Sequence, residues 1–263
     1  MNRSLTLYRF LGHRTVKGWL HPEVLTILSV LDSVQRSSNI SGAIAEIGVH
    51  HGRLFVGLNL LRRDGEHSVA IDVFDDQQYN VDNSGKGDLD RFRRNIVRWS
   101  SLDGVEISQT DSTQLESSHL LELANDRVRF FSIDGGHTQS IVLSDMKLAQ
   151  STLSTGGVVI ADDVFNQFWP GVATGTMDYL HQGGSLVPFA VGFNKVFFSE
   201  KEYAANYQAA LQRHFENRVT FYAKSSEFAG HAVVVIARVS PTPRRFLRRS
   251  ETARELYRRY KDK

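Results

Sequence analysis

The stretch Val128–Asp163 decides the fold and reads VRFFSIDGGHTQSIVLSDMKLAQSTLSTGGVVIADD. Two largely apolar runs in it, Val128–Ile133 and Gly157–Asp162, have the length of buried strands in a sheet, and Gly157–Asp162 is the more apolar of the two. The segment between them, Gln139–Thr152, has the length of a helix, and a Thr-Gly-Gly turn at Thr155–Gly157 is predicted to close it. The order strand, helix, strand predicts a right-handed crossover unit of a parallel sheet.

The same alternation of strands and helices extends outward from this stretch in both directions. On the amino-terminal side we expect a helix over Pro22–Gln35, a strand over Ala43–Ile47, a helix over Gly52–Leu61, a strand over Ser68–Asp72, a helix over Leu89–Trp99, a strand over Val105–Gln109 and a helix over Ser117–Leu123. On the carboxyl-terminal side we expect a helix near Gly171–His181, strands near Leu186–Val191 and Lys195–Phe198, and a further apolar run at Ala232–Val239. The pattern predicts a Rossmann-like, doubly wound α/β fold, with a mostly parallel sheet and helices on both faces.

Length and charge indicate a single domain with extensions at both ends. A chain of 263 residues fits one large α/β domain, so we predict a helical lead-in over residues 1–40, the main domain over 41–240 and a basic helical tail over 241–263. Residues 244–263 carry a net charge of +6 in a chain whose total is +2, which leaves the remainder at −4. A solvated terminal helix is the preferred interpretation of the tail, and contact with an acidic membrane surface is the alternative.

Composition also limits the chemistry and the location of the protein. The chain has no cysteine, which excludes disulfides, thiolate metal sites and cysteine nucleophiles and leaves carboxylates and histidines as carriers of chemistry. No run approaches the roughly 18 apolar residues of a membrane helix, and Arg3, Arg9 and Arg14 interrupt the N-terminus before a signal-like stretch develops. We expect a cytoplasmic protein with no transmembrane segment and no nucleic-acid partner. The oligomeric state stays open, a homo-oligomer included.

Acidic residues stand at the ends of five consecutive predicted strands. Ligands of an open parallel sheet bind beyond the carboxyl ends of its strands, so these positions indicate a binding site. Glycines near the first strand end let a ligand approach the backbone, and an acid after the second strand can accept hydrogen bonds from two ribose hydroxyls. The candidate cofactor-binding residues are Glu46, Gly48, Gly52, Asp72, Asp111 and Ser112, of which Asp111 is expected near an adenine amino group.

The spacing E-x-G-x-x-x-G at Glu46 to Gly52, with an acid twenty residues later, resembles the first two motifs of class I S-adenosylmethionine-dependent methyltransferases. Dinucleotide-binding folds also place an acid about 20 residues beyond their glycines. A G-x-G-x-x-G pattern laid on Gly48 would, however, need glycine at Glu46 and at His51, and the carboxylate would face a pyrophosphate. S-adenosylmethionine has a cationic sulfonium and no phosphate, so it is the cofactor that we expect.

Two further motifs resemble a more specific group. Phe131-Ser-Ile-Asp134-Gly-Gly-His137 and Gly156-Gly-Val-Val-Ile-Ala-Asp162-Asp163, taken together, resemble the macrolide-sugar O-methyltransferases and cephalosporin hydroxylase-like proteins, over about Ala43 to Phe198. The resemblance implies that Asp134, Asp162 and Asp163 bind a divalent metal and that His137 is the general base. Carboxylates at the ends of neighbouring strands suit Mg²⁺ or Mn²⁺. The alternative for His137 is a structural role in ordering its turn.

Other polar and aromatic residues near these motifs have two interpretations each. Asp145 is left outside the predicted site, because a solvent-exposed or helix-pairing role explains it as well. The polar stretch Asp75–Gly87 is either a lid over a ligand or an ordinary connection. Phe165, Phe168 and Trp169 follow the paired aspartates and either pack on an acceptor or cover the core.

The sequence thus predicts an S-adenosylmethionine-dependent, divalent-metal-assisted O-methyltransferase. Its expected partner is a small-molecule or glycan acceptor, with the methyl group going to a hydroxyl of a sugar or small natural product. The alternatives are a hydroxylase-like or nucleotide-dependent oxidoreductase on the same fold, and a noncatalytic protein that binds the cofactor.

Overall fold

The structure is a computed structural model that describes residues 3–216, 218–240 and 255. The predicted basic tail, residues 241–263, lies outside the described residues apart from Glu255. The helices are α1 (Arg3–Phe10), α2 (Pro22–Ser37), α3 (Arg53–Asn59), α4 (Leu89–Trp99), α5 (Ser117–Ala124), α6 (Gln139–Thr152), α7 (Pro170–His181) and α8 (Lys201–Phe215), with short 3-10 turns η1 (Gly12–Thr15), η2 (Gln77–Tyr79) and η3 (Ser112–Gln114). The strands are β1 (Ala43–Ile47), β2 (Ser68–Asp72), β3 (Val105–Gln109), β4 (Val128–Ile133), β5 (Leu153–Ala161), β6 (Leu186–Gly192), β7 (Lys195–Glu200), β8 (Phe221–Phe228) and β9 (His231–Arg238).

All described strands join one sheet in the order β3-β2-β1-β4-β5-β7-β6-β9-β8. The first five strands run parallel, β7 is antiparallel to both of its neighbours, and β8 is antiparallel to β9. The chain adds β2 and β3 on one side of β1, then crosses to add β4 and β5 on the other side. The carboxyl ends of β1 and β4 therefore form the topological switch point, where ligands of such sheets bind.

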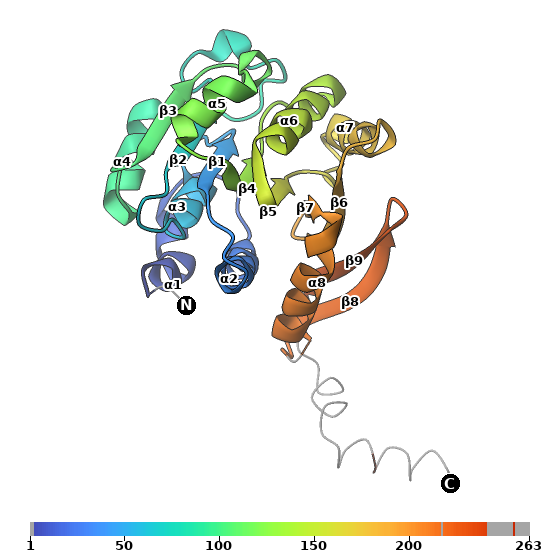
Figure 1. Ribbon diagram of the computed structural model, residues 1–263. Coiled ribbons are helices and arrows are strands. Elements are labelled where there is room, and N and C mark those ends of the chain that lie inside the picture. The colour runs from blue at the N-terminus through green and yellow to red at the C-terminus, as the bar shows by residue number, and fades with distance from the viewer. Residues whose placement is uncertain (1–2, 217, 241–254, 256–263) are drawn as a thin grey trace.

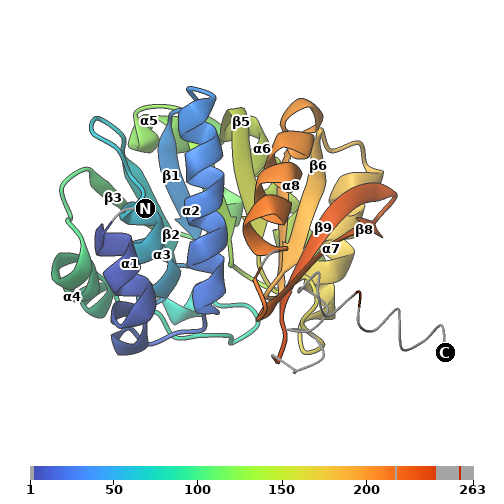
Figure 2. The ribbon, with the colours of Figure 1, turned by 90° about the horizontal axis from the view of Figure 1, so that it is seen from below.

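Helices cover both faces of the sheet (Figures 1 and 2), which confirms the predicted fold class. One apolar core joins the sheet to α1, α2, α3, α4 and α8, and a second core joins the opposite face to α5, α6 and α7. Alternation along β1 shows the division, because Ile44 enters the first core while Ala43, Ala45 and Ile47 enter the second. Among the described helices, none combines the length and the apolar character that crossing a membrane requires.

The start of β5 differs from the prediction. The turn predicted at Thr155–Gly157 is wrong, because α6 ends at Thr152 and the strand begins at Leu153, directly after it. The pairing of β4 with β5 shifts in register between Val128 and Phe130, and Gly156 has a φ of 74° within the strand. Gly156 thus allows a backbone irregularity inside β5 and does not belong to a loop before the strand.

A buried arginine near the amino-terminal end of β4 connects the sheet to α2 and to the turn before β2. Arg129 on β4 has no exposed side-chain surface, and its guanidinium donates to Asp32 of α2 at 3.0 Å and to Glu66 at 2.9 Å. It also donates to the side chain of Gln35 at 2.7 Å and to the Leu61 carbonyl oxygen at 2.8 Å. Since the buried charges are paired, this cluster fixes α2 and the turn before β2 against the sheet.

Candidate active site

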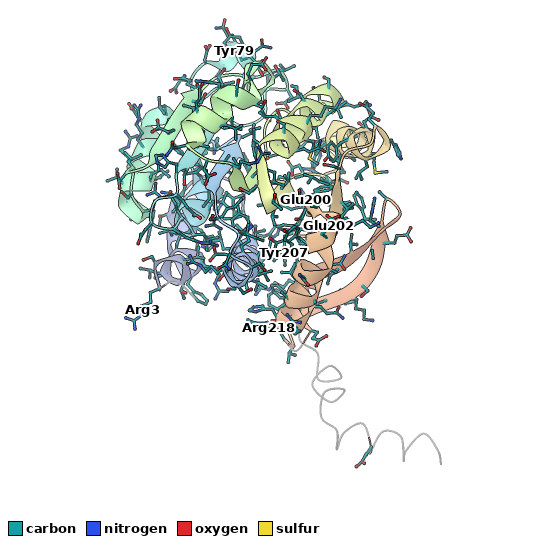
Figure 3. All side chains as sticks on the ribbon, viewed as in Figure 1. Arg3, Tyr79, Glu200, Glu202, Tyr207 and Arg218 are labelled. Carbon is teal, nitrogen blue, oxygen red and sulfur yellow. The ribbon has the colours of Figure 1, made fainter. Side chains whose placement is uncertain are left out.

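A cleft opens at the carboxyl ends of β1, β2, β3 and β4. The loop of residues 73–88, between β2 and α4, covers one side of it and contributes Gln77, Tyr79, Asn80, Val81, Ser84 and Gly85 to its walls. Figure 3 shows Tyr79 at the outer edge of the molecule, on this loop. The rest of the lining includes Gly48, Asp72, Thr110, Asp111, Ser112, Asp134, Gly135 and Gly136.

The two glycines of the first motif have different structural roles. Gly48 lines the cleft with a φ of 80°, and a Cβ atom there would overlap the carbonyl oxygen of Asp134. Only glycine therefore lets the ends of β1 and β4 approach at the switch point. Gly52, with a φ of 87°, precedes the first turn of α3 and faces Phe92 of α4. It is not among the residues that line the cleft.

Asp72, at the end of β2, is held rigidly in the cleft wall. One carboxylate oxygen accepts a hydrogen bond from the His50 amide at 2.7 Å and the other from the Phe74 amide at 2.6 Å. Burial raises the pKa of Asp72, and these two amides oppose the rise. Each oxygen keeps a lone pair for a further donor.

Asp111 and Ser112 lie after β3 on the same wall. One carboxylate oxygen of Asp111 accepts from the Thr113 amide at 2.9 Å and from the Thr113 hydroxyl at 2.8 Å. The structure therefore brings four of the six predicted cofactor residues to the cleft: Gly48, Asp72, Asp111 and Ser112.

Glu46 lies behind the cleft rather than in its lining. Glu46 is only 2% exposed, and its Oε2 atom has no hydrogen-bond partner. Burial raises the pKa of Glu46 well above its usual value; Lys195 opposes this rise, while Asp162 and Asp72 add to it. The prediction placed Glu46 among the cofactor contacts, whereas the structure places it in an acidic cluster at the ends of β1, β4 and β5.

The hairpin of β6 and β7 brings a cation into this cluster. Its two-residue turn, Phe193-Asn194, has positive φ at both positions, 55° and 68°, as tight hairpins require. Pairing of Ala161 with Val196 then sets Lys195 beside Asp162, and the buried ammonium group forms an ion pair with that carboxylate. Although burial alone would lower it, the pKa of Lys195 is raised by Asp162 and Asp134.

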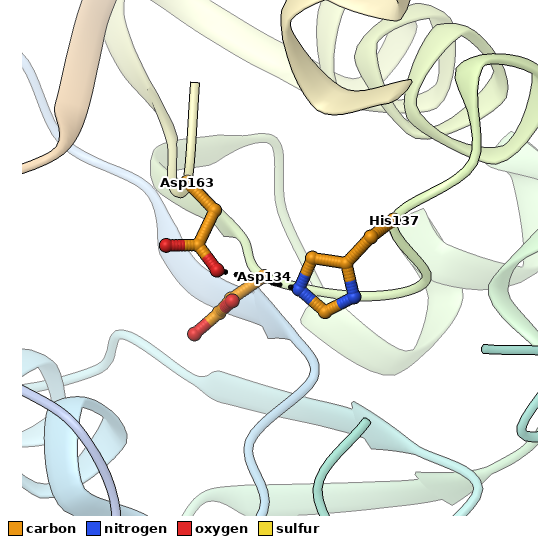
Figure 4. Close-up of side chains that lie close together, drawn as sticks. All are labelled: Asp134, His137 and Asp163. Carbon is orange, nitrogen blue, oxygen red and sulfur yellow. Dashed lines mark ion pairs between the residues drawn. The ribbon is translucent and has the colours of Figure 1, made fainter. Parts of the chain in front are cut away.

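Asp134, His137 and Asp163 converge within 4.8 Å of one another, counted between one potential ligand atom from each. Figure 4 shows the imidazole and the Asp163 carboxylate facing each other, with His137 Nε2 at 3.4 Å from the nearer oxygen. Asp163 has a φ of 58°, and its other carboxylate oxygen accepts from the Asn194 side chain. Of the three predicted metal ligands, Asp134 and Asp163 thus meet, while Asp162 is engaged by Lys195.

Two residues outside the sequence motifs hold His137. Asp82, from the loop 73–88, accepts from the His137 backbone amide at 2.6 Å and lies 2.7 Å from the ring Nδ1. The indole of Trp169 stacks on the imidazole at 4.4 Å between ring centres. Burial alone would lower the pKa of His137, but the carboxylates of Asp163 and Asp82 raise it.

Sequence reasoning placed Asp82 only within a candidate lid, left Trp169 either on an acceptor or over the core, and did not connect Lys195 with Asp162. The polar composition of residues 75–87 indicated a lid but gave no signal for which residue contacts the motif 55 positions later. Asp145 is also placed differently, because it is buried on α6 beneath the turn of residues 134–136. The interpretation of Asp145 as solvent-exposed is therefore wrong.

The charge balance of the cluster favours a cation. Four acidic side chains, Glu46, Asp134, Asp162 and Asp163, surround Lys195, which is the cation that influences Glu46 and Asp134. Burial and then Asp162 raise the pKa of Asp134 well above its usual value, so a second positive charge would relieve this repulsion. The carboxylate oxygens of Asp134 and Asp163 are donors that suit Mg²⁺ or Mn²⁺, so the residues present fit such an ion.

Comparison with known proteins agrees with this geometry. Residues 45–164 match the model of a protein family described as a methyltransferase domain, and no curated protein matches the chain by sequence. The O-methyltransferase NovP is similar in structure, with 15% identity, coverage of 67% of this chain and 80% of that chain, and a TM-score of 0.53. The SAH-bound Podospora anserina methyltransferase PaMTH1 is similar at 13% identity, with coverage of 76% and 89% and a TM-score of 0.53. The family match confirms a methyltransferase domain over residues 45–164, and the two structures confirm the fold.

Proposed function

We propose that this chain, which carries a methyltransferase domain over residues 45–164, transfers the methyl group of S-adenosylmethionine to a hydroxyl group with the help of a divalent cation. One observation carries the proposal. Asp134 belongs both to the lining of the cleft and to the group formed with His137 and Asp163, so a cofactor in the cleft would lie beside groups that can hold a cation and move a proton.

The walls of the cleft suit the polar parts of this cofactor. Asp72 has free lone pairs that would accept from two ribose hydroxyls, as an acid at the end of the second strand does in nucleoside-binding sheets. Asp111 and Ser112 would lie near the adenine, and Gly48 leaves the backbone open to close approach. The negative potential of Asp134 and the acids behind it favours a cationic sulfonium over a pyrophosphate.

Asp134 and Asp163 are the residues that would hold the divalent cation, with Asp162 kept in place by Lys195. A bound Mg²⁺ or Mn²⁺ would stabilise the negative charge of an acceptor oxygen that has lost its proton. Asn194 fixes the Asp163 carboxylate from the side of the β6-β7 turn. These contacts order the oxygens before any ligand binds, which reduces the entropic cost of binding.

His137 is the proposed general base. Because an ionised Asp82 has only acceptor oxygens, the ring proton of a neutral His137 is held on Nδ1 and Nε2 stays free to accept the hydroxyl proton. In the proposed reaction, His137 Nε2 would take the hydroxyl proton as the acceptor oxygen bonds to the methyl carbon; the bond from that carbon to the sulfur of S-adenosylmethionine would break, with S-adenosylhomocysteine as the product.

The acceptor that we propose is a sugar or small natural product with an apolar part. Phe165 and Phe168 follow Asp163 and are 53% and 75% exposed, although both are large apolar side chains. Exposed aromatic rings beside a catalytic group offer stacking surfaces for a ring-shaped ligand. This observation supports an acceptor that carries its hydroxyl on a ring system.

Ligand-dependent thermal unfolding tests the cofactor class. A ligand that binds only the folded protein raises the midpoint of unfolding, so S-adenosylmethionine and S-adenosylhomocysteine should each raise it and NAD should not. Stabilisation by NAD alone would contradict the proposal and favour the oxidoreductase alternative.

The cation is tested by the binding of Mn²⁺, followed by electron paramagnetic resonance. Asp163→Ala should weaken Mn²⁺ binding at least about tenfold, because it removes one of the carboxylate ligands. The matched control is Asp103→Ala, which changes an exposed aspartate in the turn before β3 and should bind Mn²⁺ as the wild type does. Equal binding by both variants would remove the cation from the proposal. A panel of hydroxylated acceptors, assayed for methyl transfer with and without EDTA, would then identify the substrate.

A further inference from the structure

The loop of residues 73–88 is fastened to the catalytic turn by one side chain. Asp82 Oδ2 accepts from the His137 amide at 2.6 Å and lies 2.7 Å from His137 Nδ1, so a single oxygen contacts both the backbone and the ring of one residue. Both side chains are nearly covered, at 10% exposure for Asp82 and 9% for His137. The other oxygen of Asp82 accepts from the Ser84 amide at 2.9 Å, which fixes the loop on its own side.

The same loop forms a wall of the cleft. Val81 and Ser84 flank Asp82 and line the cleft together with Gln77, Tyr79, Asn80 and Gly85. The Asn80 side chain closes the loop on itself by donating to the carbonyl oxygens of Ser84 and Gly85, at 2.6 and 2.9 Å. Because the segment from Asn80 to Gly85 is internally bonded, its contact with the cleft and its contact with His137 move together.

His137 has few other polar constraints on its ring. Trp169 stacks on one face, which restricts tilting but does not distinguish the two ring orientations that are related by a 180° flip about the Cβ–Cγ bond. The opposite nitrogen, Nε2, lies 3.4 Å from Asp163, a longer distance than that from Nδ1 to Asp82. The contact of Nδ1 with Asp82 therefore selects the ring orientation in which Nε2 faces Asp163 and the acceptor.

We propose that Asp82 is a positioning residue: it latches the loop 73–88 to His137, so that closure of the loop over the cofactor also orients the imidazole with Nε2 toward the reacting hydroxyl. The inference rests on the proposed function for the identity of the cofactor and for the role of the histidine. The latch itself is a property of the protein alone. Binding in the cleft and alignment of the base are thereby coupled through one carboxylate.

Amide hydrogen exchange and imidazole nitrogen chemical shifts, measured by NMR at one fixed pH, test the latch. In ligand-free Asp82→Ala the His137 amide should exchange about 10- to 100-fold faster than in the wild type, as expected for losing a hydrogen bond to a charged group. The His137 ring should change from a single tautomer to a mixture. Asp82→Asn keeps one acceptor oxygen and should restore most of the protection. The matched control, Asp76→Ala, removes a carboxylate of the same loop whose side chain caps no helix and should match the wild type.

Coupling is measured by adding S-adenosylhomocysteine to the same four proteins. We expect it to slow amide exchange over residues 77–85 and at His137 in the wild type and in Asp76→Ala, and to bind about tenfold more weakly to Asp82→Ala. Unchanged His137 exchange and an unchanged ring tautomer in Asp82→Ala would overturn the latch. If the ligand-free data support the latch but bound ligand does not slow amide exchange over residues 77–85, the coupling would be overturned. Failure of the wild type to bind the ligand would instead overturn the proposed function and, with it, the coupling. The latch would still be tested by the ligand-free measurement, because that measurement does not depend on ligand binding.

Discussion

Replacing Asp145 by asparagine should stabilise the protein at alkaline pH. The carboxyl group is buried on α6 beneath the turn of residues 134–136. Burial raises its pKa from 3.8 to about 7, with the Ser112 hydroxyl opposing the rise and Asp111 adding to it. Since a tenfold change in an ionisation constant corresponds to about 1.36 kcal/mol, ionising this group in the folded protein costs roughly 4 kcal/mol relative to the unfolded chain.

The sign of the effect follows from proton release. The unfolded chain loses this proton near pH 4 and the folded protein near pH 7, so unfolding releases a proton between these values. The contribution of Asp145 to stability is therefore most favourable below about pH 4, falls as the pH rises to about 7 and is constant above it. Asparagine stays neutral throughout, so Asp145→Asn should gain up to about 4 kcal/mol at pH 8 and little at pH 4.

Urea unfolding followed by circular dichroism, at pH 5 and at pH 8, measures this difference. The free energy of unfolding of Asp145→Asn should exceed that of the wild type by more at pH 8 than at pH 5. Asp103→Asn makes the same chemical change at an exposed position and should show no pH-dependent difference. The argument would be refuted by a variant whose difference from the wild type is the same at both pH values, or by one that is less stable at pH 8.

The remaining predictions concern buried packing and the switch point. Arg129→Met should lower the free energy of unfolding by about 3–5 kcal/mol, because it leaves Asp32 and Glu66 buried without their shared cation. Urea unfolding at pH 7 measures this loss, and a value below about 1 kcal/mol would show that the cluster is not essential. Gly48→Ala should reduce binding of S-adenosylhomocysteine at least about tenfold, since the added Cβ forces the ends of β1 and β4 apart. Calorimetric affinities equal to those of the wild type would contradict the role given to Gly48.

The central strands could be predicted closely from the sequence. The predicted ranges of β1, β2, β3 and β4 coincide with the observed bounds. Three of these strands, β1, β2 and β4, are buried along nearly their whole length, and a strand with both faces covered is typically rich in apolar residues. The carboxyl-terminal part was harder, and the edge strand β8 was not predicted. Its sequence, FYAKSSEF, is largely exposed and owes its conformation to antiparallel pairing with β9.

The candidate site was predictable only as far as local motifs reach. The positions of Gly48, Asp72, Asp111 and Asp134 follow from the rule that ligands bind at the carboxyl ends of parallel strands. The pairing of Lys195 with Asp162 depends on the register of an antiparallel strand, and the contact of Asp82 with His137 spans 55 positions through an irregular loop. Neither contact has a periodic signal in the sequence, so both required the folded arrangement.

The central claim is that acids at consecutive strand ends bind S-adenosylmethionine in the cleft, and calorimetric titration with S-adenosylhomocysteine tests it most directly. The account predicts one binding site in the wild type, about tenfold or weaker binding by Asp72→Asn, which loses one carboxylate acceptor, and wild-type affinity for Asp76→Asn in the same loop. A wild-type protein that takes up no S-adenosylhomocysteine, or an Asp72→Asn variant that binds it equally well, would contradict the account.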